Sequence, residues 1–463
     1  MLTRRLAAVV SGVLAVIGAL LPGAAAAAAA PRAATVPCSW PMYGHDAGRS
    51  FAQSRRCTEI HRGTVTALTP AWFLPTADSV TASPAVVGGT AYVGSWDGVM
   101  HAINQRTGRE RWRFAIGDTS NTAFGRIESS AAVVDVAGRR VVIFGGGATV
   151  YVLDARNGRE LTSVCVDPRE SGADRCQGNS DGAIEIESSP AVVGVGDHLE
   201  VVVGMDVHNA DHVGRTGVVS FGLSRTHGWT LEPRWKFDPE TRRTYTGPAL
   251  LTEGAGAGDG CASVWSSPAV DVANNMVFFG TGSCSAPGVT SGESMWGIRL
   301  SDGKFVWTFD AHAPERYPSR NWDDDFGASP NLLPGGLVGE GSKGGTYYAL
   351  DRLTGSLRWE THAGQAGHVT SGFAVGGMIG SAAVGRVNGR PAVFATTAIS
   401  TPLRAPLDEN PGDIDPALLD DPGRLFSIHA MSVEDGSILW RSPLSRASYG
   451  AASYANGVVF APS

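Results

Sequence analysis

Three adjacent carboxylates are the strongest chemical signal in the sequence. They lie in the run Asn321-Trp322-Asp323-Asp324-Asp325-Phe326-Gly327. Carboxylates at the start of a buried β-repeat are costly unless a cation or hydrogen bonds compensate them. The run therefore predicts either a compensated, chemically active group or a solvated acidic loop.

A lysine and a tryptophan elsewhere in the chain could complete such a site. Lys343 lies in Gly341-Ser342-Lys343-Gly344-Gly345. This is not a phosphate loop, because the spacing from Gly336 is wrong and no helix follows. Trp265 offers an aromatic face, which suits a planar heterocycle but also ordinary packing. A surface lysine on a glycine turn is the alternative interpretation of Lys343.

The elements that would position these residues belong to a repeat. One phrase, with a Gly four residues before a Trp, ends at Trp112, Trp307, Trp359 and Trp440, and degenerate copies end at Thr162 and Trp235. Each phrase predicts a strand, a tight turn and a second strand. Two further strands precede it, and we expect the innermost ones to start near Ser83, Ser129, Ser189, Ser267, Ser329 and Gly380. Four strands per irregular repeat of about 40–50 residues predict an all-β fold, a β-propeller of four-stranded blades.

The N-terminal residues and the composition indicate the broad class of protein. Residues 1–30 have the basic start, apolar stretch and small-residue end of a signal peptide, which predicts a secreted protein. We expect an N-terminal arm over residues 31–62 and the propeller over 63–463. No later apolar run has the length of a membrane span. The net charge of −7 contains no basic stripe, which argues against a nucleic-acid partner.

The six cysteines predict three disulfides in an exported protein. Sequence order suggests Cys38–Cys57, Cys165–Cys176 and Cys261–Cys284. We also expect the last pair to face each other across a hairpin that turns at Val272-Ala273-Asn274-Asn275.

The repeat phrases resemble the tryptophan-docking motifs of quinoprotein alcohol dehydrogenases, which use pyrroloquinoline quinone (PQQ) and have eight-bladed propellers. The resemblance runs from about Trp40 to the last residue, and its start is similar to secreted polyvinyl alcohol dehydrogenases. It implies that Val65 to Phe73 is the strand that closes the last blade. It also implies that the chain is truncated within a seventh blade that begins at Tyr449. The aromatic residues of the arm are expected to cover the propeller face.

The same resemblance assigns the candidate site. Asp323 matches the base that takes the alcohol proton, and Lys343 matches the cation beside the quinone oxygens. Trp265 matches the floor on which the quinone stacks, and Tyr449 matches another aromatic near it. The implied calcium ligands are Asp211, Ser283 and Asp323. This chain departs from the family pattern in having Ser283 in place of an Asn, in needing a one-residue shift to align Asp211, and in lacking an adjacent Cys pair.

Two functions follow from these residues. The first is a secreted PQQ- and calcium-dependent oxidoreductase that takes a proton from an alcohol and transfers hydride to the quinone. Because the chain has no Cys-x-x-Cys-His haem motif, its electrons would leave to a separate acceptor. The second is a non-catalytic propeller that serves as an envelope scaffold or binding module, since fold does not settle function.

Overall fold

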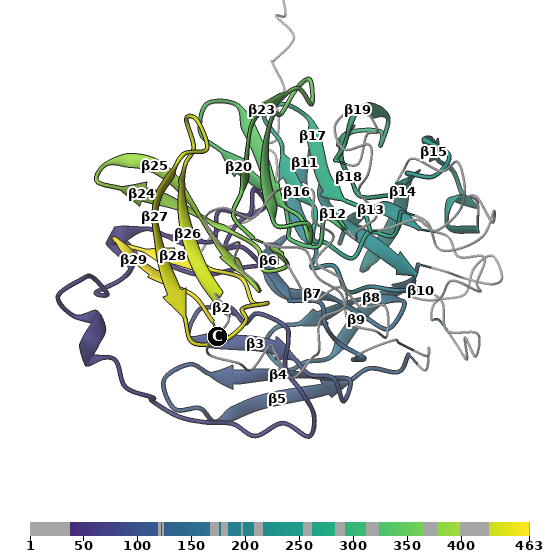
Figure 1. Ribbon diagram of the computed structural model, residues 1–463. Helices are drawn as coiled ribbons and strands as arrows, with labels where there is room; N and C mark the ends of the chain where they lie inside the picture. The colour runs from purple at the N-terminus through teal and green to yellow at the C-terminus, as the bar shows by residue number, and fades with distance from the viewer. Residues whose placement is uncertain are drawn as a thin grey trace, which may run out of the picture.

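The structure is a computed structural model in which the chain is an all-β protein (Figure 1). It describes residues 38–118, 122, 125–166, 176, 184–195, 198–207, 216–252, 262–282, 292–311, 324–364, 377–398 and 426–462. The helical segments of this part of the chain are three short 3-10 turns: η1 (Arg55–Cys57), η2 (Val65–Ala67) and η3 (Leu250–Thr252).

The strands form antiparallel sheets that we call blades 1 to 6, in chain order. Blade 1 contains β2 (Ala85–Val87), β3 (Thr90–Gly94), β4 (Val99–Asn104) and β5 (Glu110–Ala115). Blade 2 contains β6 (Ala132–Val136), β7 (Arg139–Gly146), β8 (Thr149–Asp154) and β9 (Glu160–Cys165). Blade 3 contains β10 (Ile184–Glu185), β11 (Ala191–Val195), β12 (His198–Val207), β13 (Gly217–Ser224), β14 (Thr230–Asp238) and β15 (Arg243–Tyr245).

The second half of the chain repeats the arrangement. Blade 4 contains β16 (Ala269–Asp271), β17 (Met276–Gly280), β18 (Ser294–Arg299) and β19 (Phe305–Asp310). Blade 5 contains β20 (Asn331–Leu333), β21 (Leu337–Gly341), β22 (Thr346–Asp351) and β23 (Leu357–His362). Blade 6 contains β24 (Ala383–Val387), β25 (Arg390–Thr397), β26 (Phe426–Ser432) and β27 (Ile438–Leu444). A seventh sheet joins β1 (Ala52–Gln53) in parallel to β28 (Ser453–Ala455), which pairs with β29 (Val458–Phe460).

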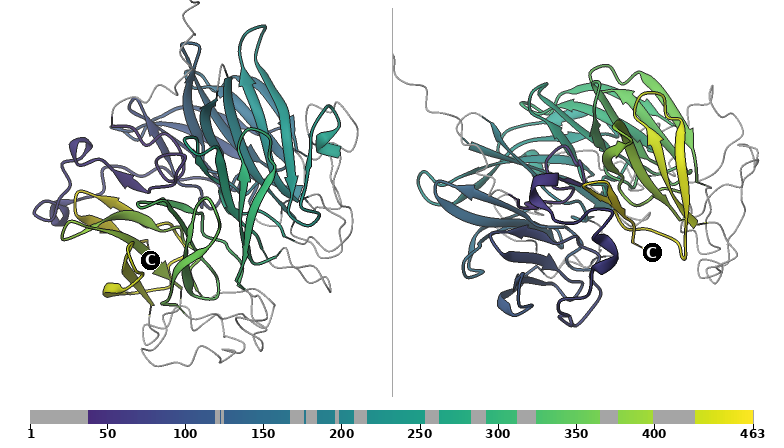
Figure 2. Two further views of the ribbon diagram at one scale, coloured as in Figure 1. Left: turned by 90° about the horizontal axis from the view of Figure 1, so that it is seen from above. Right: turned by 90° about the vertical axis from the view of Figure 1, so that its left-hand side faces the viewer.

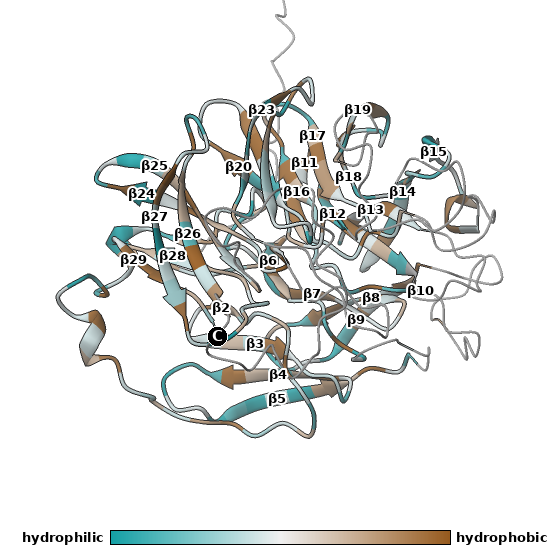
Figure 3. Ribbon diagram, viewed as in Figure 1, coloured by the Kyte–Doolittle hydropathy of each residue, from teal (hydrophilic) through white to brown (hydrophobic). Residues whose placement is uncertain are grey.

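The expected starts of the innermost strands are confirmed, since each strand begins two or three residues after its predicted serine or glycine. The innermost strands of consecutive sheets lie beside each other from β2 through β24 to β28, as in a propeller (Figure 2). The apolar cores lie between neighbouring sheets, as with Val193 of blade 3 and Val270 of blade 4. Figure 3 colours the strands β16 and β17 brown, which marks hydrophobic residues, and β15 teal, which marks hydrophilic ones. The number of blades in a complete ring stays a prediction, as do the division at residues 30 and 62 and the truncation.

Serine hydroxyls connect each blade to the next at these strand starts. The backbone N–H of Ser189 donates to the hydroxyl of Ser267 at 2.8 Å, and that of Ser267 donates to Ser329 at 3.0 Å. The same bond joins Ser83 to Ser130, Ser130 to Ser189 and Ser329 to Ser381. The repeated Ser therefore accepts a backbone donor that strand pairing leaves open.

Tryptophans of one blade dock on the turn glycines of the next blade. Trp307 of blade 4 covers Gly355 of blade 5 and donates its indole N–H to the Arg352 carbonyl at 3.0 Å. Gly355 has φ +70°, and a Cβ there would lie 2.6 Å from the indole, so only glycine fits. The same pairs are Trp72 with Gly108, Trp112 with Gly158, Trp235 with Gly303, and Trp359 with Gly436.

The prediction of a strand from Val65 to Phe73 is wrong for the described structure. This segment contains η2 and no strand, because no neighbouring strand supplies ladder hydrogen bonds to it. Trp72 still docks on blade 1, with its indole N–H 2.8 Å from the Gln105 carbonyl. Trp72 thus makes the docking contact of the repeats from a segment that is not a strand.

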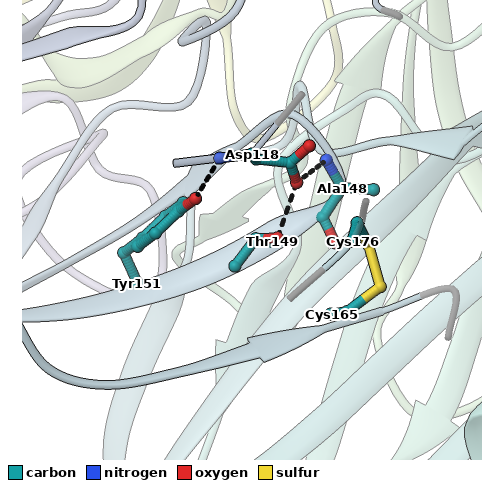
Figure 4. Close-up of a disulfide and its surroundings, with 6 residues drawn as sticks. All are labelled: Asp118, Ala148, Thr149, Tyr151, Cys165 and Cys176. Atoms are coloured by element: carbon teal, nitrogen blue, oxygen red, sulfur yellow. Dashed lines mark hydrogen bonds between the residues drawn. A yellow bond between two sulfur atoms is a disulfide. The ribbon is translucent and has the colours of Figure 1, made fainter. Parts of the chain in front are cut away.

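Two of the three expected disulfides, Cys38–Cys57 and Cys165–Cys176, are confirmed. Figure 4 shows the second beside Asp118, whose carboxylate accepts from the Ala148 N–H and the Thr149 hydroxyl. Cys261 and Cys284 lie outside the described residues. The hairpin near them exists, but it pairs Asp271 with Met276, so positions 261 and 284 are not equidistant from its turn.

Candidate functional site

Trp265 and Lys343 meet, although they belong to neighbouring blades and are far apart in the sequence. Trp265 lies in the segment that leads into β16, and Lys343 lies in the turn between β21 and β22. The Lys343 ammonium is 5.0 Å from the centroid of the Trp265 ring, within the range of a cation–π interaction. This contact brings together two of the four residues that were expected to converge, and their roles stay predictions.

Asp325 fixes the position of Lys343. Its carboxylate lies 2.6 Å from the Lys343 Nζ, and the Lys343 N–H donates to the Asp325 carbonyl at 2.8 Å. Only 15% of the Lys343 side chain and 7% of the Asp325 side chain are exposed. The two opposite charges therefore form a largely buried ion pair, which orients the lysine side chain.

Glycines bring the remaining parts of the site into contact. A Cβ on Gly327 would overlap the Trp265 ring, and one on Gly344 would overlap the Asp324 carboxylate. Asp324 is fully buried, and its backbone N–H donates to the Glu293 carboxylate at 3.2 Å. The glycines flanking the acidic run and Lys343 are therefore required by close approach rather than by turn conformation.

A second acidic group, which the sequence analysis missed, lies next to this site. One carboxylate oxygen each from Glu185, Glu187 and Asp206 lie within 4.8 Å of one another. Asp206 directly follows Met205, whose carbonyl accepts from the Val264 N–H at 3.0 Å, and Trp265 directly follows Val264. The alternation Glu185-Ile186-Glu187, which places both carboxylates on one side of an extended chain, was the available signal.

The other predicted site residues are not brought together by the described structure. Asp323, Asp211 and Ser283 lie outside the described residues. Tyr449 is 41% exposed and precedes Gly450, whose carbonyl faces Thr396 of blade 6. Burial raises the pKa of Tyr449 to about 12, so its hydroxyl stays protonated at neutral pH.

Glu340 is a buried acid in β21, the strand that leads to Lys343. Its side chain lies against Gly280 and near Phe326, and it is cross-strand from Tyr348. Both its oxygens are buried without a hydrogen-bond partner among the described residues. Burial raises the pKa of Glu340 well above its usual range. The carboxyl therefore keeps its proton in the folded protein.

This predicts a pH dependence of stability. The unfolded chain releases the Glu340 proton above about pH 4.3, whereas the folded chain retains it, so the free energy of unfolding falls as pH rises through this window. E340Q should remove the loss, and its advantage over the wild type should grow by up to about 1.4 kcal/mol per pH unit. Urea unfolding of both proteins from pH 4 to pH 8 measures this. Parallel curves would contradict it.

Comparison with known proteins identifies the family of the chain. Residues 40–369 match the family model described as "PQQ: Glucose/ethanol/alcohol dehydrogenase, beta-propeller domain". The chain belongs to this family. All the described contacts among Trp265, Asp325 and Lys343 fall within the part of the PQQ propeller domain that matches.

Curated relatives of this PQQ propeller are dehydrogenases. The chain is 26% identical over 377 residues to quinohemoprotein alcohol dehydrogenase of Comamonas testosteroni, covering 73% of this chain and 49% of that protein. It is 25% identical over 349 residues to quinohemoprotein alcohol dehydrogenase ADH IIB of Pseudomonas putida, covering 67% and 46%. The chain thus spans about half the length of the curated relatives it matches.

Solved structures show the same fold. A europium-containing methanol dehydrogenase superposes with a TM-score of 0.62 at 16% identity, covering 91% of this chain and 81% of that one. The quinohemoprotein alcohol dehydrogenase of Comamonas testosteroni gives 0.53 at 17% identity, covering 93% and 77%. Among the described residues, no helix has the length and apolar character needed to cross a membrane.

Proposed function

We propose that this chain is a secreted PQQ-dependent oxidoreductase that oxidises an alcohol and passes the electrons to a separate acceptor. The observation that carries the proposal is the contact between Lys343 and the Trp265 face, 5.0 Å from ammonium to ring centroid. An aromatic floor with a fixed cation at it suits a flat, electron-poor quinone. Bound PQQ would supply the acceptor for the hydride of the alcohol carbon.

The residues of this chain have distinct roles in the proposal. Trp265 stacks the quinone ring, and Gly327 leaves the indole the space it needs. Once it has left the Trp265 face, Lys343 would place a positive charge at the quinone oxygens, and Asp325 would remain its partner. Asp323 takes the hydroxyl proton, and Tyr449 lines the site; both roles stay predictions.

A calcium ion fits the acidic group beside the site. Calcium takes six to eight oxygen ligands, and Glu185, Glu187 and Asp206 bring carboxylate oxygens together. Two of these residues, Glu185 and Asp206, are buried, where clustered carboxylates are costly without a cation. We propose that this group holds the metal. Asp211, Ser283 and Asp323, the ligands implied by the family resemblance, lie outside the described residues and stay predicted ligands.

The non-catalytic interpretation has its own supporting observation. The Lys343 ammonium lies over the Trp265 ring and is paired with Asp325. A stacked quinone needs that face, so Lys343 has to move to the quinone rim. If this ion pair holds it in place, the propeller serves as a scaffold or binding module.

Titration with PQQ and calcium separates the two functions. Added PQQ should quench the tryptophan fluorescence of the purified protein, and quinone absorbance should appear at one PQQ per protein chain. W265L should lose most of this binding. W229F is the matched control, because Trp229 is also partly exposed but belongs to blade 3. D323N should bind the quinone and lose alcohol turnover. Quenching that is absent in the wild type, or equal in W265L, would favour the scaffold.

A further inference from the structure

The N-terminal arm, here residues 38–57, runs along the axis-facing edges of the blades. Its carbonyls accept the backbone N–H of the second residue in six innermost strands, at 2.7–2.9 Å. The donor–acceptor pairs are Val86 with Trp40, Val133 with Pro41, Val270 with Ala47, Leu332 with Gly48, Val384 with Ser50, and Tyr454 with Phe51. One short segment therefore accepts an inner-edge backbone N–H from nearly every sheet.

Arg49 extends these contacts to the remaining blade. Its side chain is fully buried and donates to the carbonyls of Ser189 in blade 3 at 2.8 Å and Pro268 in blade 4 at 2.9 Å. A third bond, at 2.6 Å, goes to the Tyr43 carbonyl within the arm. Pro268 lies three residues after Trp265, so Arg49 acts on the segment that carries the candidate site.

The disulfide Cys38–Cys57 joins the two ends of this arm. The arm contacts the sheets in the order in which they follow one another, from blade 1 at Trp40 to the seventh sheet at Phe51. Figure 1 shows its purple trace beside the yellow β28 and β29. The disulfide therefore closes the arm into a covalent loop and links the first sheet to the last described one.

The two described disulfides differ in accessibility. Cys38 is exposed and Cys57 is partly exposed, whereas Cys165 is fully buried and Cys176 is buried. A thiol reductant needs access to a sulfur atom, so it should cut the arm disulfide first. Reduction would leave the blades intact and change only their common inner support.

We propose that the arm, closed by Cys38–Cys57, holds the blades together at the propeller axis. Reduction of this disulfide then loosens the packing of all the blades around that axis. A dithiol breaks the S–S bond, Cys38 and Cys57 each gain one electron and one proton, and the dithiol becomes a disulfide. The closed loop then becomes an open strap whose ends can release Trp40 and Phe51. The arm is in this way a redox-sensitive conformational device that acts on the site through Arg49.

Hydrogen–deuterium exchange of the whole protein tests this without any ligand. Mild dithiothreitol followed by alkylation, with mass mapping to verify that Cys165–Cys176 is intact, gives the opened form. Amides of the six donor strands should then exchange at least tenfold faster in peptides from all the blades concerned. Faster exchange confined to residues 38–57 and 453–460 would overturn the proposal.

A substitution at Arg49 provides a second measurement. R49Q should speed exchange in the peptides that contain Ser189 and Pro268, with the disulfide still formed. R56Q is the matched control, since Arg56 belongs to the same arm but is exposed in η1. If R49Q does not fold, hydrogen–deuterium exchange of the reduced wild type still tests the proposal. Equal exchange in R49Q and R56Q would remove Arg49 from the mechanism.

Discussion

Lys343→Met should lower the free energy of unfolding by about 3–5 kcal/mol, because it leaves the Asp325 carboxylate buried without its cation. Both side chains are largely buried and their charged atoms are 2.6 Å apart. The same substitution removes the charge proposed to lie at the quinone oxygens, so any PQQ-dependent turnover should be lost. Chemical denaturation and a turnover assay measure the two effects separately.

An exposed lysine provides the control. Lys304 pairs with Asp302 at 3.8 Å and is 66% exposed, and surface pairs contribute about 0–1 kcal/mol. K304M should therefore change stability little. The double variant K343M/D325N should recover part of the stability that K343M loses, because it removes the buried carboxylate charge that the lysine no longer balances. A loss in K343M no larger than in K304M would show that the buried ion pair does not stabilise the site.

Gly327→Ala should displace the Trp265 indole and weaken binding of a planar cofactor. A Cβ at this position would overlap the six-membered part of the ring, so either the indole or the backbone has to shift. Over-packing of this kind costs about 1–3 kcal/mol of stability. Tryptophan fluorescence, thermal unfolding and PQQ titration would each report the change.

The clash can be tested by a double-mutant cycle. W265L removes the ring that Gly327 accommodates, so G327A should cost much less in the W265L background than in the wild type. The cycle thus separates a clash with Trp265 from a general cost of alanine at position 327. Equal costs in the two backgrounds would show that Gly327 is needed for another reason.

Much of the fold could be predicted from local sequence. The recurring Gly and Trp phrases predicted the hairpins, because a positive-φ glycine in a tight turn is a local requirement that repeats with each blade. The docking of each tryptophan on a glycine of the next blade is a contact between repeats, which the structure shows. Ser-Pro and similar steps marked the innermost strands, and the hydroxyls of Ser189, Ser267 and Ser329 each accept an N–H of the preceding blade. The segment from Val65 to Phe73 failed this reasoning, since a strand needs a partner that local sequence does not supply.

For the site, the sequence by itself determined which residue types were available and in which repeats Trp265, Lys343 and the acidic run would lie. Only the tertiary structure decided which carboxylate pairs with Lys343, because three adjacent Asp residues are chemically equivalent until the backbone orients them. It also decided that Glu185, Glu187 and Asp206 form one group and that the arm lies against the inner strands instead of covering a face. These arrangements depend on contacts between segments distant in sequence, which periodicity and spacing do not encode.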